Sequence, residues 1–170
     1  MKKLKTTFSA FETEQPQIEI LKYNKKMGGF MVTLANEEIK MITYFEGVTK
    51  ASVKDCVLLE DKIIFVVAPG NLGRAIGKGG SIIQDIRRRI NKKIVVVEYR
   101  ENLNDFLNEF FFPVKIDVQV SERMKEKIAT IKVRENDRGL VLGRGGEKIK
   151  DAKMLAMRYF DTDLKVFSVK

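Results

Sequence analysis

The stretch AIGKGGSIIQDIRRR, residues 75–89, places three glycines and a lysine directly before an amphipathic pattern that is typical of a helix. The stretch LVLGRGGEKIKDAK, residues 140–153, repeats this arrangement. The tetrads GKGG and GRGG begin at Gly77 and Gly143, which are 66 residues apart, and at the same offset Ile83 aligns with Ile149. An internal repeat on this scale predicts two copies of one small fold.

In each copy the pattern predicts the element order α-β-β-α-α-β. In the first copy, residues 35–48 have a helical spacing closed by Gly47, and strands are expected over 51–60 and 60–69. A short helix from its N-cap Asn71 to Ile76 precedes the tetrad. A helix from Ser81, with Ile82, Ile83, Ile86 and Ile90 on its apolar face, and a strand over 93–99 follow it.

The second copy repeats the order. A helix over 102–111, capped by Asn102 or Asn104, is stopped by Pro113, and residues 114–133 predict a hairpin. Asp137 takes the place of Asn71 before a short helix over 139–142. The next helix has an apolar face of Ile149, Ala152, Ala156 and Tyr159, and a strand over 163–169 follows.

We therefore expect an α+β protein with one domain over residues 31–100 and a second over 101–170. Only residues 100–102 join the two copies, so the domains have little freedom to move independently. Residues 1–30 match neither copy and form an N-terminal extension, in which 18–23 predict a strand and 23–29 a turn. Phe110, Phe111 and Phe112 lie away from the tetrads in the sequence, so we expect them in the core or in domain packing rather than as platforms for base stacking.

The excess positive charge lies on the two tetrad regions. The chain carries a formal net charge of +9. Seven basic residues and one acidic residue lie in 71–93, giving +6, and six basic and two acidic residues lie in 138–158, giving +4. The remainder is therefore slightly acidic. Charge gathered in this way indicates a polyanionic partner rather than a generally basic surface.

The composition narrows the possible chemistry. The 170 residues include no histidine, which removes histidine metal sites and histidine-based nucleophile pairs. The single Cys56 lies in an apolar segment and is expected to be a buried thiol in a reducing compartment. We find no pattern of an export signal or a membrane span, and expect a cytoplasmic protein.

The tetrads do not fit the common nucleotide-binding motifs. A P-loop needs four residues between its glycines and a hydroxyl after the lysine, whereas Gly73 and Gly77 are separated by three residues and Gly79 follows Lys78. A predicted helix, rather than a strand, precedes each tetrad. The remaining pattern is helix, Gly-x-x-Gly, helix. Such a turn lets a backbone approach closely, and the amides of the second helix favour an anion such as a nucleic-acid phosphate.

These motifs resemble KH domains. The segment from Ile76 to Ile86 and the segment from Leu142 to Ile149 match the KH signature, and two hairpin strands before the loop are similar to the type II, prokaryotic arrangement. From about residue 32 to 170 the chain most closely resembles the archaeal form of the transcription factor NusA, a tandem of two such domains. The resemblance implies binding of nascent single-stranded RNA, about four nucleotides per domain. It also implies modulation of termination or antitermination by RNA polymerase, with no cofactor, and we expect a monomer.

The resemblance assigns RNA contacts to the loops and their flanks. The glycines contact the backbone while Lys78 and Arg144 meet phosphates. Ile76 and Leu142 form an apolar floor under the bases or belong to the core, and one arginine of 87–89 must point away from the RNA. The predicted RNA-binding residues are Arg74, Ile76, Gly77, Lys78, Gly79, Gly80, Arg87, Arg88, Leu142, Gly143, Arg144, Gly145, Gly146 and Lys148.

Two alternatives remain. A ribosome-associated or RNA-processing KH protein would use the same loops. An enzyme with a carboxylate-held metal is a different class, with the pairs Glu98 and Glu101 or Asp161 and Asp163 as its best acidic candidates. These carboxylates have the sequence context of strand ends and turns, so we expect a binding protein rather than an enzyme.

Overall fold

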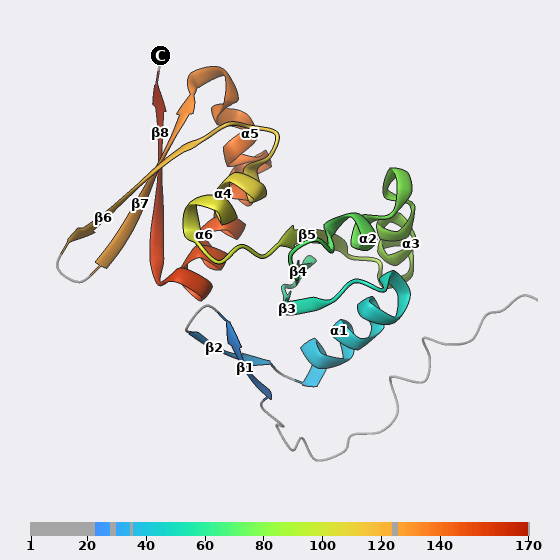
Figure 1. Cartoon of the computed structure of the whole chain (residues 1–170). Helices are drawn as coiled ribbons and strands as arrows, with labels where there is room; N and C mark the ends of the chain where they lie inside the picture. The colour runs from blue at the N-terminus through green and yellow to red at the C-terminus, as the bar shows by residue number, and fades with distance from the viewer. Residues whose placement is uncertain (1–22, 28–29, 35, 124–125, 170) are drawn as a thin grey trace, which may run out of the picture.

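The structure is a computed structural model that describes residues 23–27, 30–34, 36–123 and 126–169. Figure 1 shows two α+β units side by side, connected by the short segment between β5 and α4. The first unit consists of α1 (Asn36–Thr49), β3 (Val53–Leu58), β4 (Lys62–Val67), α2 (Leu72–Ile76), α3 (Ser81–Ile90) and β5 (Lys93–Glu98). The second unit consists of α4 (Leu103–Phe111), β6 (Asp117–Arg123), β7 (Glu126–Arg134), α5 (Arg138–Leu142), α6 (Glu147–Phe160) and β8 (Thr162–Val169). The predicted order α-β-β-α-α-β is therefore confirmed in both copies.

Each unit contains one three-stranded sheet with the same topology. The strand orders are β3-β4-β5 and β6-β7-β8, in which the hairpin is antiparallel and the last strand joins in parallel. The parallel strand needs a crossover connection, and in each unit the two helices around the tetrad supply it. The tetrad therefore lies inside this crossover in both units.

A further hairpin precedes the first unit. Strand β1 (Tyr23–Met27) pairs antiparallel with β2 (Phe30–Leu34). The prediction of a turn over 23–29 was wrong for residues 23–27, which are extended because they form a ladder with β2. The strand predicted over 18–23 lies outside the described residues except for Tyr23.

Three local predictions about helix ends need correction. Helix α1 continues past Gly47 to Thr49, and it is Lys50 that takes the left-handed conformation, with φ 57°. Asn71 precedes α2 but makes no capping bond, because its Oδ1 accepts from the Ser52 amide and so ties α2 to the start of β3. Asp137 makes no side-chain cap either. Asn102, in contrast, caps α4 by accepting from the Asp105 amide at 2.8 Å.

The first sheet is covered on both faces. One face packs on its own helices, where Phe45 of α1 stacks on Phe65 of β4 with ring centroids 3.9 Å apart. Ile64 and Val66 face the other way and belong to one continuous core with Tyr159 of α6. All six residues of β4 are buried as a result.

Among the described residues, the second sheet is covered on one face only, since burial alternates along β7. Helices α4 and α6 thus lie between the two sheets, and this packing sets the orientation of one unit relative to the other (Figure 1).

The three consecutive phenylalanines behave differently from one another. Phe111 is fully buried and Phe110 is half-buried, which confirms the expectation of core packing. Phe112 is 76% exposed, so the same expectation was wrong for it, because helix α4 ends at Phe111 and the chain turns outward.

Candidate nucleic-acid interface

The two Gly-x-x-Gly loops adopt one backbone conformation. Gly79 and Gly145 both have φ 60° and ψ 19°. Gly77 has φ 75° and ψ 169°, and Gly143 has φ 73° and ψ 176°. The sequence repeat is therefore also a geometric repeat, in which a short 3-10 turn leads into the long helix each time.

The glycines serve two different purposes. A Cβ on Gly77 would lie 2.6 Å from Cγ1 of Ile82, and a Cβ on Gly143 would lie 2.7 Å from Cβ of Lys148, so the first position of each loop has no room for a side chain. A Cβ on Gly79 or Gly145 would meet nothing within 4 Å. The left-handed φ favours glycine there, and the open space lets another backbone approach the loop.

The tips of both loops are exposed and carry a cation. Lys78 with Gly79, and Arg144 with Gly145, are exposed. Among the described residues, no acceptor is recorded for the amides of Lys78 and Gly79, while the Gly80 amide donates to the Gly77 carbonyl. Each loop leads into the N-terminus of a helix of ten or more residues, α3 or α6. Free amides, a positive helix end and a basic side chain together fit an anion.

The predicted flanking residues differ in their availability. Ile76 and Leu142 are half-buried and pack on the edges of their cores. Both predicted roles, an apolar floor under the bases and a place in the core, therefore stay open for them. Arg74 is exposed on α2. Arg88 is exposed and lies 3.4 Å from Asp85, whereas Nη2 of Arg87 donates to the Ile94 carbonyl at 2.8 Å. Arg87 therefore ties α3 to β5, and its guanidinium is partly occupied by its own fold.

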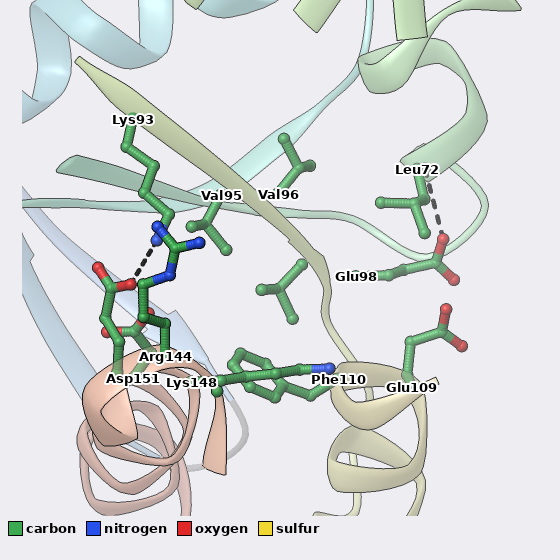
Figure 2. A pocket seen from close by; sticks show the side chains of 13 residues that line it. Leu72, Lys93, Val95, Val96, Glu98, Glu109, Phe110, Arg144, Lys148 and Asp151 are labelled. Carbon is green, nitrogen blue, oxygen red and sulfur yellow. Dashed lines mark hydrogen bonds and ion pairs between the residues drawn. The ribbon is translucent and has the colours of Figure 1, made fainter. Parts of the chain in front are cut away.

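Lys148 points toward α4 of its own unit rather than along its own loop. Its Nζ lies 5.4 Å from the centroid of the Phe111 ring, and burial lowers the pKa of its ammonium. Figure 2 shows this side chain extending toward Phe110 in the space between the units.

Two groups of ionic contacts join the two units, and neither was predicted from the sequence. In the first, Nζ of Lys62 on β4 lies 2.7 Å from Asp151 and 3.2 Å from Glu147 on α6, and Lys93 pairs with the same glutamate. Hydrogen bonds from Lys93 and Lys62 lower the pKa of Glu147. Burial alone would lower the pKa of Lys62, but its bonds to Asp151 and Glu147 outweigh this and raise it.

The second group surrounds Asp55, which is fully buried in β3. The Arg158 guanidinium donates to its carboxylate at 2.7 and 3.1 Å, and the Tyr159 hydroxyl donates to Oδ2. Burial, followed by the charge of Asp55, raises the pKa of Tyr159 well above its usual value. Both groups fix α6, and with it the second loop, against the sheet of the first unit.

The gap between the units contains a cavity of about 340 Å³. Figure 2 shows Val95 of β5, Phe110 of α4 and the start of α6 around it. Gly143 and Arg144 of the second loop also line this cavity. Phe110 therefore lies beside the second loop, and the expectation that it lies away from the tetrads was wrong for it. The second loop thus opens onto the sheet of the first unit, a juxtaposition that could not be read from either copy alone.

Two of the four carboxylates considered for catalysis, Glu98 and Asp163, form ion pairs with basic side chains of their own unit. Glu98 accepts from the Leu72 amide and pairs with Arg100. Asp161 ends α6 in a left-handed conformation, and Asp163 pairs with Lys153. In the described part of the chain no three Asp, Glu or Cys side chains gather in a way that could hold a metal ion. Within the same residues no helix is long and apolar enough to cross a membrane.

Comparison with known proteins agrees with this geometry. Residues 38–127 match the model of the KH domain family. The chain is 33% identical over 129 residues to a protein of Methanocaldococcus jannaschii named "Probable transcription termination protein NusA", covering 75% of this chain and 70% of that protein. It is 35% identical to the protein of the same name from Halococcus morrhuae, covering 78% of this chain and 95% of that one.

The chain belongs to the archaeal NusA family of KH-domain proteins. A solved structure supports the fold: the crystal structure of APE1850 is similar with a TM-score of 0.71 and 34% identity, covering 80% of this chain and 100% of that one. The expected membership of the NusA family and the expected α+β KH fold are therefore both confirmed.

Proposed function

We propose that this protein binds single-stranded RNA along both Gly-x-x-Gly loops and acts in transcription termination, in association with RNA polymerase. The observation that carries the proposal is the duplicated loop, with one backbone conformation, an exposed tip and a cation at the same position in both copies. Transcription termination as the process is taken from the names of the NusA relatives. Binding of an RNA backbone is inferred from the chemistry of the loops.

The RNA backbone would lie over Gly79 and Gly145, where no Cβ stands in the way. Phosphates would accept hydrogen bonds from the loop amides and from Lys78 and Arg144, which are charge-assisted and therefore short and strong. Two KH units of about four nucleotides each hold about eight or more nucleotides. The ionic contacts around Asp55 and Lys62 would hold the two loops in a fixed position relative to each other, so that one extended RNA strand can contact both.

The test is fluorescence anisotropy with a labelled RNA of about ten nucleotides. A loop variant that combines Lys78→Asp, Gly79→Asp, Arg144→Asp and Gly145→Asp should lose most of its affinity. The open space at Gly79 and Gly145 accommodates the aspartates, which tolerate a left-handed backbone better than most residues. The control combines Lys115→Asp, Lys127→Asp and Lys165→Asp, three exposed positions that produce the same change in net charge.

Equal losses in the loop variant and the control would mean that only overall charge matters, and unchanged binding in the loop variant would refute the loop assignment. Polymerase association is tested separately by affinity purification of the tagged full chain. Recovery of RNA polymerase subunits is expected, whereas recovery of ribosomal particles alone would assign the protein to ribosome-associated or RNA-processing work.

A further inference from the structure

The cavity between the two units has walls that suit a flat, partly polar ring. Val95 and Val97 line one side and belong to the core that β5 shares with the second unit, away from its own helices. Figure 2 shows Phe110 of α4 across from Val95. Single-stranded RNA is recognised by unstacked bases that lie on apolar or aromatic side chains and hydrogen-bond through their edges. The volume of about 340 Å³ is within the range of small-ligand sites.

The second loop connects this cavity to the RNA path. Gly143 and Arg144 line the cavity together with Glu147 and Lys148. A nucleotide whose phosphate sits at the amides of the second loop therefore has this cavity within reach of its base. The apolar wall is not repeated on the matching face of the second sheet. There Lys165, which pairs with Thr130, takes the place of Val95, which pairs with Ile64.

Glu109, in the wall of the cavity, has an oxygen that no described residue uses as a hydrogen-bond acceptor. Both oxygens of Glu98 are used, by the Leu72 amide and by Nη2 of Arg100 at 2.8 Å. Oε2 of Glu109 accepts from Arg100 at 2.9 Å, while its Oε1 accepts no hydrogen bond from any described residue. The side chain of Glu109 is 28% exposed, so a bound base would displace little water from it.

We propose that this cavity binds one unstacked RNA base and that Glu109 selects a base with an exocyclic amino group, meaning adenine, cytosine or guanine over uracil. The inference rests on the RNA-binding function proposed above. An ionised carboxylate only accepts hydrogen bonds. The exocyclic amino groups of adenine, cytosine and guanine donate to it. Uracil has no amino group, and its N3–H lies between two carbonyl oxygens whose partial negative charges oppose the carboxylate.

The test compares labelled oligocytidine and oligouridine of about ten nucleotides, measured by anisotropy with the full chain. The wild-type protein should prefer oligocytidine by about tenfold, as one charge-assisted base contact supplies. Glu109→Gln should bring the ratio close to one, because an amide can donate to the uracil carbonyl as well as accept. Glu60 is an exposed carboxylate in the turn between β3 and β4, outside the cavity lining, so Glu60→Gln removes the same charge and should keep the wild-type ratio.

A second variant tests the cavity itself. Val95→Phe fills the space and should weaken oligocytidine binding about tenfold, while Lys165→Phe at the matching position of the second sheet should not. Thermal unfolding of each variant shows whether the fold is kept. If the loop variant loses RNA but Glu109→Gln keeps the wild-type ratio and Val95→Phe keeps the affinity, the cavity inference is wrong and the RNA-binding function stands. If the loop variant binds RNA as the wild type does, the function itself is wrong.

Discussion

The buried carboxylate of Asp55 is the sharpest test of how the two units hold together. It is 0% exposed and receives two bonds from Arg158 and one from the Tyr159 hydroxyl, all across the boundary between the units. Asp55→Ala leaves the guanidinium and the hydroxyl without their acceptor in a confined place. Breaking one partner of a buried ion pair costs about 3–5 kcal/mol. The side chain of Arg158 is 29% exposed, so water can partly solvate its charge once the partner is lost. We therefore expect a loss of stability at the lower end of this range, about 3 kcal/mol.

The assay is urea unfolding followed by circular dichroism, with a thermal scan beside it. For a chain of this length, about 3 kcal/mol corresponds to a fall of roughly 10 °C in Tm. The matched control is Asp117→Ala. Asp117 lies at the corresponding position on the exposed face of the second sheet, opposite Lys132 as Asp55 is opposite Val66. Asp117 is exposed, so its loss should change stability by less than about 0.5 kcal/mol. Equal effects of the two substitutions would refute the reasoning that the interface depends on Asp55.

Three further outcomes are expected. The Cys56 thiol is fully buried and burial raises its pKa, so the folded protein should resist alkylation at neutral pH and react once urea unfolds it; rapid reaction of the native protein would contradict this. Lys93 and Lys62 lower the pKa of Glu147, so its stabilisation is present above the ordinary value of 4.5 and is lost as pH falls through the lowered value. Glu147→Gln should therefore flatten the urea midpoint plotted against pH between about 5 and 3, whereas an unchanged pH profile would argue against the pairing. Gly143→Ala should lower Tm clearly more than Gly145→Ala, because only the first new Cβ meets an atom at 2.7 Å; equal shifts would mean that the conformation of the backbone alone decides.

The sequence predicted what is local and what is repeated. The helical spacing around Ile83 and Ile149, the hairpins and the Gly-x-x-Gly turns all appear where the pattern indicated. The ends of the helices were predicted less accurately. Asn71 has the residue type of a cap, but its side chain bonds to the Ser52 amide, a tertiary contact that no local pattern contains.

The packing of one copy against the other could not be predicted in the same way. One signal was available: residues 62–67 (KIIFVV) form a nearly continuous apolar run, whereas 127–133 (KIATIKV) alternate. A continuous run indicates a strand covered on both faces, and alternation a strand covered on one. The partners of Lys62 and Asp55 on α6 could not be found, because residues 85 or more positions apart meet only through the tertiary fold.

The central claim, that both loops hold one RNA strand, is tested most directly by affinity as a function of RNA length. Strands of about four nucleotides fill one unit and strands of about ten fill two. For the wild-type protein, the second contact is intramolecular, so affinity should rise steeply with length. Disabling one loop alone, by Lys78→Asp with Gly79→Asp or by Arg144→Asp with Gly145→Asp, should abolish that rise. If either single-loop variant still gains affinity with length as the wild type does, the two loops do not share a strand.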